Sequence, residues 1–152
     1  MLPDQPGTYV LILELCRHSM IAVGKLGTFD FPAGWYTYAG SARGPGGLAA
    51  RVSRHERAAK TLHWHIDYLR AQADLIAIWY ATGLRERECT WAQALSQLPG
   101  ASLPVSRFGA SDCRCPAHLI HFSSQPHVKP FADLVEAPVR DISFRHRSRS
   151  AT

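Results

Sequence analysis

Short apolar runs rich in β-branched and aromatic residues recur along the chain, separated by turn-forming residues. The run at 7–15 is nearly continuous, which predicts a strand with a well-buried face. The aromatic run at 35–38 also favours a strand, and the glycine-rich segment after it cannot continue one. Further strands are predicted at residues 19–23, 28–31, 74–82 and 118–122.

Apolar residues at helical spacing predict three helices between these strands. The Ala- and Arg-rich segment from Leu48 favours a helix whose inward stripe is Leu48 and Val52. Arg51 and His55, also four residues apart, border that stripe. The two other helices are expected at residues 62–71, where Leu62, Ile66 and Leu69 face the core, and at residues 85–98.

This order of elements predicts an α/β chain of the α+β kind, with a small, mostly antiparallel sheet flanked by helices. A chain of 152 residues most simply forms one domain. We place that domain at residues 1–125 and treat 126–152 as a C-terminal extension. Its last segment, 145–152, contains three arginines and is expected to be a mobile basic tail that adds phosphate affinity.

The composition of the chain indicates which kinds of molecule it is expected to bind. A net charge of +5 favours a polyanion such as DNA or RNA. No apolar run is long enough to span a membrane, so no membrane partner is expected. The N-terminal residues lack the basic start and apolar core of a signal peptide, which predicts a cytoplasmic protein whose four cysteines are thiols.

An ordered set of motifs is spread over these elements. Gly7-Thr8-Tyr9 lies in the first strand, Tyr38-Ala39-Gly40 ends a later one, Arg51 and His55 share a helix, and Glu88 opens another. This set resembles the GIY-YIG nuclease superfamily. Further segments resemble a small prokaryotic branch of it, in which uncharacterised domains are sometimes joined to endonuclease III-type repair enzymes: residues 38–42, 47–55, 63–69, 88–89 and 108–113.

The resemblance implies metal-assisted hydrolysis of phosphodiester bonds on a three-stranded antiparallel core with extra strands. It implies Tyr9 and Tyr38 on neighbouring strands, and Arg51 as the group that neutralises phosphate charge. His55 relays a proton or orients the phosphate, and Glu88 holds Mg²⁺ or Mn²⁺. We favour Tyr9 as the general base, with Tyr38 as its hydrogen-bonding partner. The pKa of the Tyr9 phenol is expected to be lowered beside Arg51 and the metal.

The chain departs from the superfamily pattern in three respects. Thr8 and Ala39 stand where the superfamily name has isoleucine. The interval from Gly7 to Tyr38 is long, so an extra strand or hairpin is expected within 17–31. The downstream asparagine has no counterpart, because the chain contains no asparagine.

Other polar residues near these motifs are candidates for supporting roles. We assign substrate contacts to Ser41, Arg43, Arg54, Lys60 and His63, and a place near the metal to Asp67 and Asp112. An alternative for His63 and Asp67 is a polar helix face that caps the helix start and hydrogen-bonds to a loop. His65 is expected to point elsewhere.

Cys113-Arg-Cys115-Pro-Ala-His118 suggests zinc, with Cys89 as a fourth ligand. The spacing differs from the usual knuckle, in which two to four residues separate the cysteines. The favoured interpretation is therefore a turn around Asp112 with small thiols packed behind the active site.

Three functions remain open at this stage. The first is a metal-dependent endonuclease selective for DNA structure rather than sequence, acting in repair or DNA processing and associated with base-excision or other repair enzymes. The second is a non-catalytic nucleic-acid-binding domain that retains the fold. The third is a zinc- or thiol-dependent regulatory domain.

Overall fold

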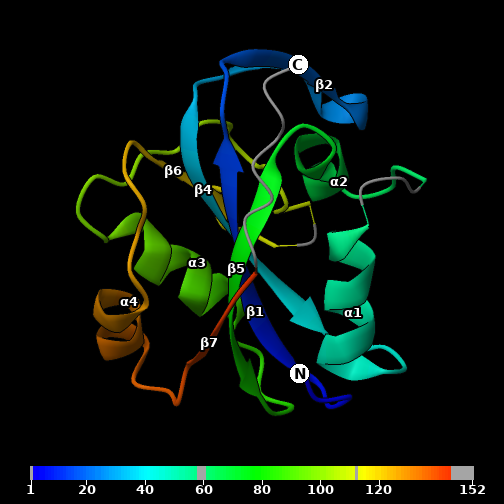
Figure 1. The fold of residues 1–152 in the computed structure, drawn as a ribbon, viewed down its shortest axis with the longest axis vertical. Coiled ribbons are helices and arrows are strands. Elements are labelled where there is room, and N and C mark those ends of the chain that lie inside the picture. Colours follow the sequence, from blue (N-terminus) through cyan, green and yellow to red (C-terminus); the bar gives the residue numbers. More distant parts are fainter. Residues whose placement is uncertain (1, 58–60, 112, 145–152) are drawn as a thin grey trace.

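The computed structural model describes residues 2–57, 61–111 and 113–144, and they form an α+β fold built on a five-stranded sheet (Figure 1). The strands run in the order β6-β4-β1-β5-β7, and every neighbouring pair is antiparallel. The sheet strands are β1 Gly7–Leu15, β4 Gly34–Ala42, β5 Asp74–Thr82, β6 Leu119–Phe122 and β7 Arg140–Ser143. The helices are α1 Gly47–Glu56, α2 His65–Arg70, α3 Glu88–Ser96 and α4 Val128–Val135.

The sheet has helices on both faces, which explains why β1 is almost continuously apolar. Tyr9, Leu11 and Leu13 point toward α1 and α2, whereas Val10 and Ile12 point toward α3 and α4. Figure 1 shows the two helix pairs on opposite sides of the sheet. The central strand is therefore buried on two faces, and the antiparallel sheet expected from the sequence is confirmed.

The long interval between the two tyrosine motifs contains the expected hairpin. β2 Ser19–Val23 and β3 Gly27–Phe31 form a separate two-stranded sheet, joined by a short 3₁₀ turn at Gly24–Leu26. Ile21, Val23 and Phe31 are buried in the same core as the α1 side of the main sheet. The insertion thus extends that core and leaves the pairing of β1 with β4 intact.

Two helices are shorter than the periodicity predicted. α2 begins at His65 rather than near Leu62, and Leu62 is 42% exposed instead of facing the core. The reason is local: the Asp67 carboxylate accepts the backbone N–H groups of His63 and Trp64, which starts the helix after them. α3 begins at Glu88 rather than 85.

The segment 128–143 adds a helix and an edge strand to the main sheet. α4 carries the buried Phe131, whose ring centroid lies 5.3 Å from that of Trp79 and 5.1 Å from that of Trp91. β7 then pairs with β5 at the edge of the sheet. The basic tail predicted at 145–152 lies outside the described residues.

Within the described ranges, no helix has both the length and the apolar character needed to cross a membrane.

Replacement of Phe131 tests whether α4 belongs to the same cooperative unit. Phe131→Ala removes a fully buried ring between two tryptophans and should lower the free energy of unfolding by about 3–5 kcal/mol in a single transition. Leu134→Ala, on the same helix but 47% exposed, should cost less than about 1 kcal/mol. Denaturant unfolding followed by circular dichroism measures both. A separate low-stability transition in wild-type protein would show that α4 unfolds independently.

Candidate active site around the end of strand β4

The second half of β4 borders an open cavity of about 370 Å³. β6 pairs with β4 only from Trp35 to Tyr38, so the end of β4 has β1 on one side and no strand on the other. Arg51 of α1 reaches this edge, and its Nη1 donates to the Ser41 carbonyl at 2.9 Å. The cavity is lined by these residues predicted from the sequence: Tyr9, Tyr38, Ser41, Arg51, His63 and Glu88.

Tyr9 and His55 form a buried hydrogen-bonded pair at the base of the cavity. The Tyr9 hydroxyl lies 2.8 Å from His55 Nε2, and both side chains are almost completely buried. Gly40 stands opposite Tyr9 in the strand pairing, where a Cβ atom would lie 2.5 Å from the tyrosine Cζ. Glycine is therefore needed at position 40 for the Tyr9 ring to lie across β4.

Both tyrosines have raised pKa values in the protein without a metal ion. Burial raises the pKa of Tyr9, and the nearby Arg51 guanidinium offsets this only in part. Burial also raises the pKa of Tyr38, and the Tyr9 and Glu88 side chains add to the rise. Because both pKa values are raised, both phenols are protonated at neutral pH in the protein alone. The hydrogen-bonding partner of Tyr9 is His55 rather than Tyr38.

Arg51 is held by an aromatic side chain that the sequence analysis did not select. Its guanidinium carbon lies 4.6 Å from the centroid of the Trp64 ring, and that of Arg54 lies 4.0 Å from the same ring. Cation–π contacts of this kind orient a guanidinium without using its N–H donors. Trp64 also lines the cavity.

Arg54 and Asp67, which the sequence analysis placed near the substrate and the metal, form an ion pair with each other. Both Asp67 oxygens accept from Arg54, at 2.8 Å each, and Oδ2 also accepts the backbone N–H groups that start α2. Burial of the Asp67 carboxylate would raise its pKa, but these hydrogen bonds prevail and lower it to about 2. The alternative of a helix-capping role is thus confirmed for Asp67.

Glu88 reaches the cavity although α3 covers the opposite face of the sheet. Its Oε2 accepts a hydrogen bond from Ser41 Oγ at 3.1 Å, and its Oε1 lies 3.1 Å from His118 Nδ1. The His118 contact is an ion-pair distance rather than a well-aligned hydrogen bond. The Glu88 side chain therefore reaches the cavity around the edge of β4 beyond Tyr38. Among the described residues, it is the only carboxylate that lines the cavity.

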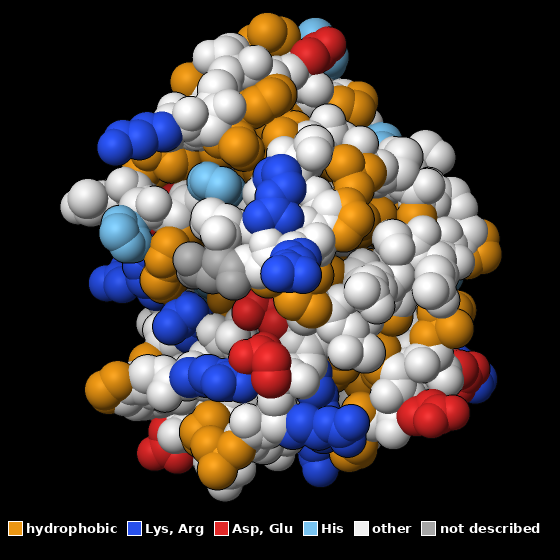
Figure 2. Space-filling model, turned by 180° about the vertical axis from the view of Figure 1, so that it is seen from behind, with side chains coloured by type: hydrophobic (Ala, Val, Ile, Leu, Met, Phe, Trp, Pro, Cys, Tyr) orange, Lys and Arg blue, Asp and Glu red, His pale blue; other side chains and the backbone are white. Residues whose placement is uncertain are grey.

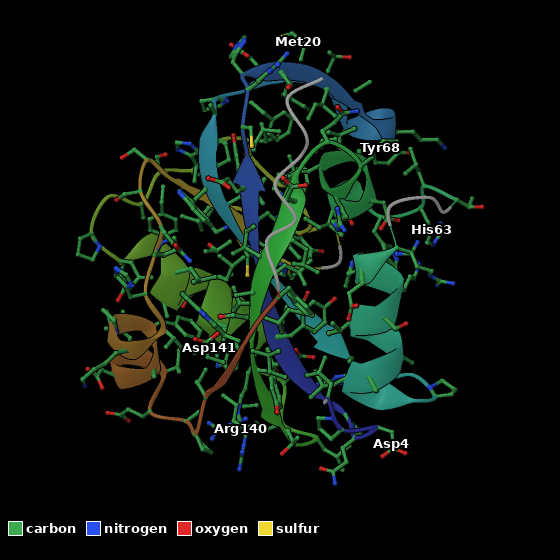
Figure 3. The ribbon with its side chains drawn as sticks, in the orientation of Figure 1. Asp4, Met20, His63, Tyr68, Arg140 and Asp141 are labelled. Carbon is green, nitrogen blue, oxygen red and sulfur yellow. The ribbon has the colours of Figure 1, made fainter. Side chains whose placement is uncertain are left out.

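The remaining predicted residues have different positions. Arg43 does not line the cavity and pairs with Glu86 at 2.6 Å on the exposed surface. His63 is exposed and lines the cavity beside the end of α1 (Figure 3). Lys60 and Asp112 lie outside the described residues.

His65 is the functional candidate that sequence reasoning placed elsewhere. It lines the cavity, and its Nδ1 accepts the Gly109 N–H at 2.9 Å. Burial lowers the pKa of His65, so the neutral ring carries its proton on Nε2. No short-range pattern indicated this contact, because Gly109 lies 44 residues from His65 in the sequence.

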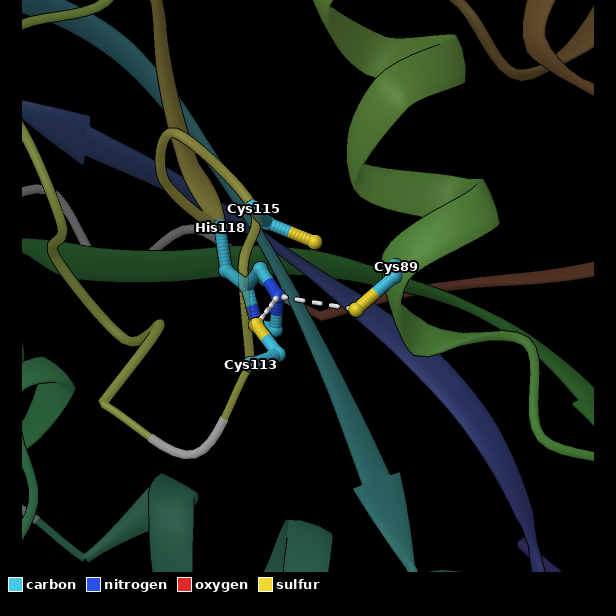
Figure 4. Close-up of side chains that lie close together, drawn as sticks. All are labelled: Cys89, Cys113, Cys115 and His118. Carbon is cyan, nitrogen blue, oxygen red and sulfur yellow. Dashed lines mark hydrogen bonds between the residues drawn. The ribbon is translucent and has the colours of Figure 1, made fainter.

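Cysteine and histidine side chains gather beside Glu88. Cys89 of α3 and Cys113, Cys115 and His118 of the loop before β6 converge, as Figure 4 shows. The predicted packing of separate thiols behind the site is therefore incomplete, since the four potential ligands face one another. Burial raises the pKa values of the Cys89 and Cys115 thiols, and Cys113 adds to both rises, whereas the contact with Cys89 offsets part of the rise at Cys115.

The surface on the reverse side of the molecule is rich in basic groups. Figure 2 shows Lys and Arg side chains around a small acidic patch near the centre of this face. Together with the net charge of +5, this distribution favours contact with a polyanion.

Comparison with known families adds one match. Residues 8–139 match the family described as "Domain of unknown function DUF123". The chain belongs to this family. The DUF123 region extends from β1 beyond α4 and contains every residue that lines the cavity. No curated protein and no solved structure matches the chain.

The Asp67 ion pair gives a pH-dependent stability prediction. Asp67→Asn should lower the free energy of unfolding at pH 7 by about 2–4 kcal/mol, because it leaves the Arg54 guanidinium without its charged partner. The folded pKa is about 2, below the unfolded value of about 3.9. The difference in free energy of unfolding between wild type and Asp67→Asn should therefore be largest above about pH 4 and decline as the pH falls toward 2.

Urea unfolding between pH 7 and pH 2 measures this difference. Asp133→Asn is the matched control, because Asp133 forms an exposed pair with Lys129 and should contribute less than about 0.5 kcal/mol. A difference between wild type and Asp67→Asn that stays constant over the whole pH range would contradict the ion-pair account.

Proposed function

We propose that this DUF123 chain is a divalent-metal-dependent endonuclease that hydrolyses phosphodiester bonds in DNA. One observation carries the proposal: Tyr9, Arg51 and Glu88, which come from β1, α1 and α3, line a single cavity. Their roles in the proposal follow the likeness to GIY-YIG nucleases. We further propose that the protein acts in the cytoplasm and selects nucleic-acid shape rather than base order.

In this proposal, Arg51 binds the scissile phosphate. A guanidinium carries five N–H donors, so its contact with the Ser41 carbonyl leaves others for phosphate oxygens. Its charge does not depend on pH in the working range, and Trp64 restricts its position. The Tyr38 hydroxyl and the Nε2–H group of the neutral His65 ring are donors at neutral pH and can hydrogen-bond to the phosphate or the leaving oxygen.

Glu88 would hold the divalent cation, Mg²⁺ or Mn²⁺. Each of its oxygens has one polar neighbour, which leaves lone pairs for a further contact. Mg²⁺ commonly keeps several waters and needs only one or two carboxylates, so this donor set fits it. When bound, the cation supplies Lewis-acid stabilisation of the charge that develops on the phosphate.

Proton removal from the attacking water is assigned to Tyr9 together with His55. Because burial raises the Tyr9 pKa, a standing phenolate is unfavourable. The hydroxyl instead takes a proton from water while its own proton passes to His55 Nε2, 2.8 Å away. Tyr9 therefore carries one proton before and after the step, and the buried His55 imidazole holds the proton that Tyr9 gave up.

The second candidate function is binding without hydrolysis. The basic face favours it equally, because phosphate contacts alone supply most non-specific affinity. RNA is the alternative substrate or ligand. The likeness to domains joined to endonuclease III-type enzymes extends the proposal to association with base-excision or other repair enzymes.

Substitutions at the cavity separate the two functions. Arg51→Ala and Glu88→Gln should each reduce Mg²⁺-dependent cleavage by about 10²–10³-fold, because each removes a group that meets the transition-state charge. Binding, measured by fluorescence anisotropy, should persist. Arg43→Ala is the matched control and should cleave at the wild-type rate, since Arg43 lies outside the cavity.

The assay uses labelled duplex, single-stranded, branched and damaged DNA, and RNA, with Mg²⁺ and with Mn²⁺. If wild-type protein binds these substrates and cleaves none of them, the non-catalytic function replaces the nuclease.

A double-mutant cycle tests the proton relay. Tyr9→Phe and His55→Gln should each slow cleavage by about 10²–10⁴-fold, and the double variant should be no slower than either one. Residues that act as one unit show this non-additivity. Single-turnover kinetics measure the rates, and thermal unfolding identifies variants that do not fold. Independent, multiplying effects would exclude a shared relay.

A further inference from the structure

Four potential metal ligands from two distant parts of the chain meet outside the cavity beside β4. Cys89 belongs to the first turn of α3, and Cys113, Cys115 and His118 belong to the loop that leads into β6 (Figure 4). One ligand atom from each lies within 4.8 Å of all the others. Such convergence requires the tertiary fold, since the sequence spacing does not match a zinc knuckle.

The spacing within the cluster is close to that of a tetrahedral zinc site. Bonds of about 2.3 Å to sulfur and 2.0 Å to nitrogen place neighbouring ligand atoms roughly 3.5–3.8 Å apart. Cys89 Sγ lies 3.7 Å from His118 Nε2, and Cys113 Sγ lies 3.3 Å from the same nitrogen. Adjustments of about 1 Å or less at the widest pair would complete a tetrahedron.

The orientation of His118 is the second observation that points to a metal. The side chain is 2% exposed, with Nε2 directed at the sulfur atoms and Nδ1 at the Glu88 carboxylate. A metal-bound histidine commonly has this arrangement, in which a carboxylate holds the nitrogen that does not bind the metal.

We propose that Cys89, Cys113, Cys115 and His118 bind a structural Zn²⁺ ion through three sulfur atoms and His118 Nε2. Binding releases the three thiol protons to solvent, so a 2+ ion and three thiolates form a centre of net charge −1. Four protein ligands fill the tetrahedron and leave no open position for substrate, which is typical of a structural site. A mixed sulfur and nitrogen set suits zinc, whereas Mg²⁺ prefers oxygen.

The ion would join the beginning of α3 to the loop that supplies Gly109 and Ser111 to the cavity. Glu88 precedes one ligand directly and contacts a second, so the zinc centre fixes the position of this carboxylate from two sides. The negative charge of the centre also favours a cation at Glu88. This inference concerns zinc content and does not require phosphodiester hydrolysis.

The decisive measurement is metal analysis of untagged protein together with a thiol count. We expect about one zinc per chain in wild type and in Cys16→Ser, because Cys16 is exposed and lies outside the cluster. Of the four cysteines, Cys16 should react at once with a thiol reagent, and the other three only after a strong chelator is added. Cys113→Ser should retain less than about a tenth of the zinc.

Two further measurements on folded protein complete the test. Replacement of the ion by Co²⁺ should produce the intense visible absorption of a tetrahedral thiolate site in wild type and in Cys16→Ser. Glu88→Gln should still bind zinc, with affinity about 10–100-fold weaker in chelator competition, because the His118 partner is altered. Metal-free wild type whose four thiols all react at once, a disulfide within the cluster, or iron in place of zinc would each overturn the proposal.

Discussion

The architecture of the candidate site depends on the early end of the pairing between β6 and β4. Beyond Tyr38, no strand among the described residues pairs with the outer edge of β4, so its polar groups must find other partners. Arg51 satisfies the Ser41 carbonyl, and the Ser41 hydroxyl in turn contacts Glu88. Because the edge is open, side chains from both faces of the sheet can reach one space.

A second constraint is the way α1 and α2 are held together. The buried Asp67 carboxylate binds Arg54 of α1 and also begins α2, so one charged group fixes two helices. Arg54 then stacks on Trp64, which stacks on Arg51. A structural ion pair thereby determines where the candidate phosphate-binding guanidinium lies. The energetic cost of burying this pair is offset by its complete set of hydrogen bonds.

The proposed zinc centre and the proposed cation at Glu88 differ in chemistry although they are close in space. Thiolates and imidazole select zinc, whereas a carboxylate with water selects Mg²⁺ or Mn²⁺. His118 links the two, because one ring nitrogen faces sulfur and the other faces Glu88. In this arrangement one ion would stabilise the fold and the other would contact the substrate.

The sequence by itself determined the strands from β1 to β6, the three helices among them, the inserted hairpin and most of the residues around the cavity, but neither α4 nor β7. Local signals suffice for these features, because apolar periodicity, glycine and proline act over a few residues. It did not predict the pairing of β7 with β5, because this is a long-range contact. Tertiary structure alone decided that His55 pairs with Tyr9, that Arg54 pairs with Asp67, and that Cys89 meets Cys113 and Cys115. Each of these outcomes depends on side-chain direction and burial across elements far apart in the chain, and no pattern within a short window encodes it.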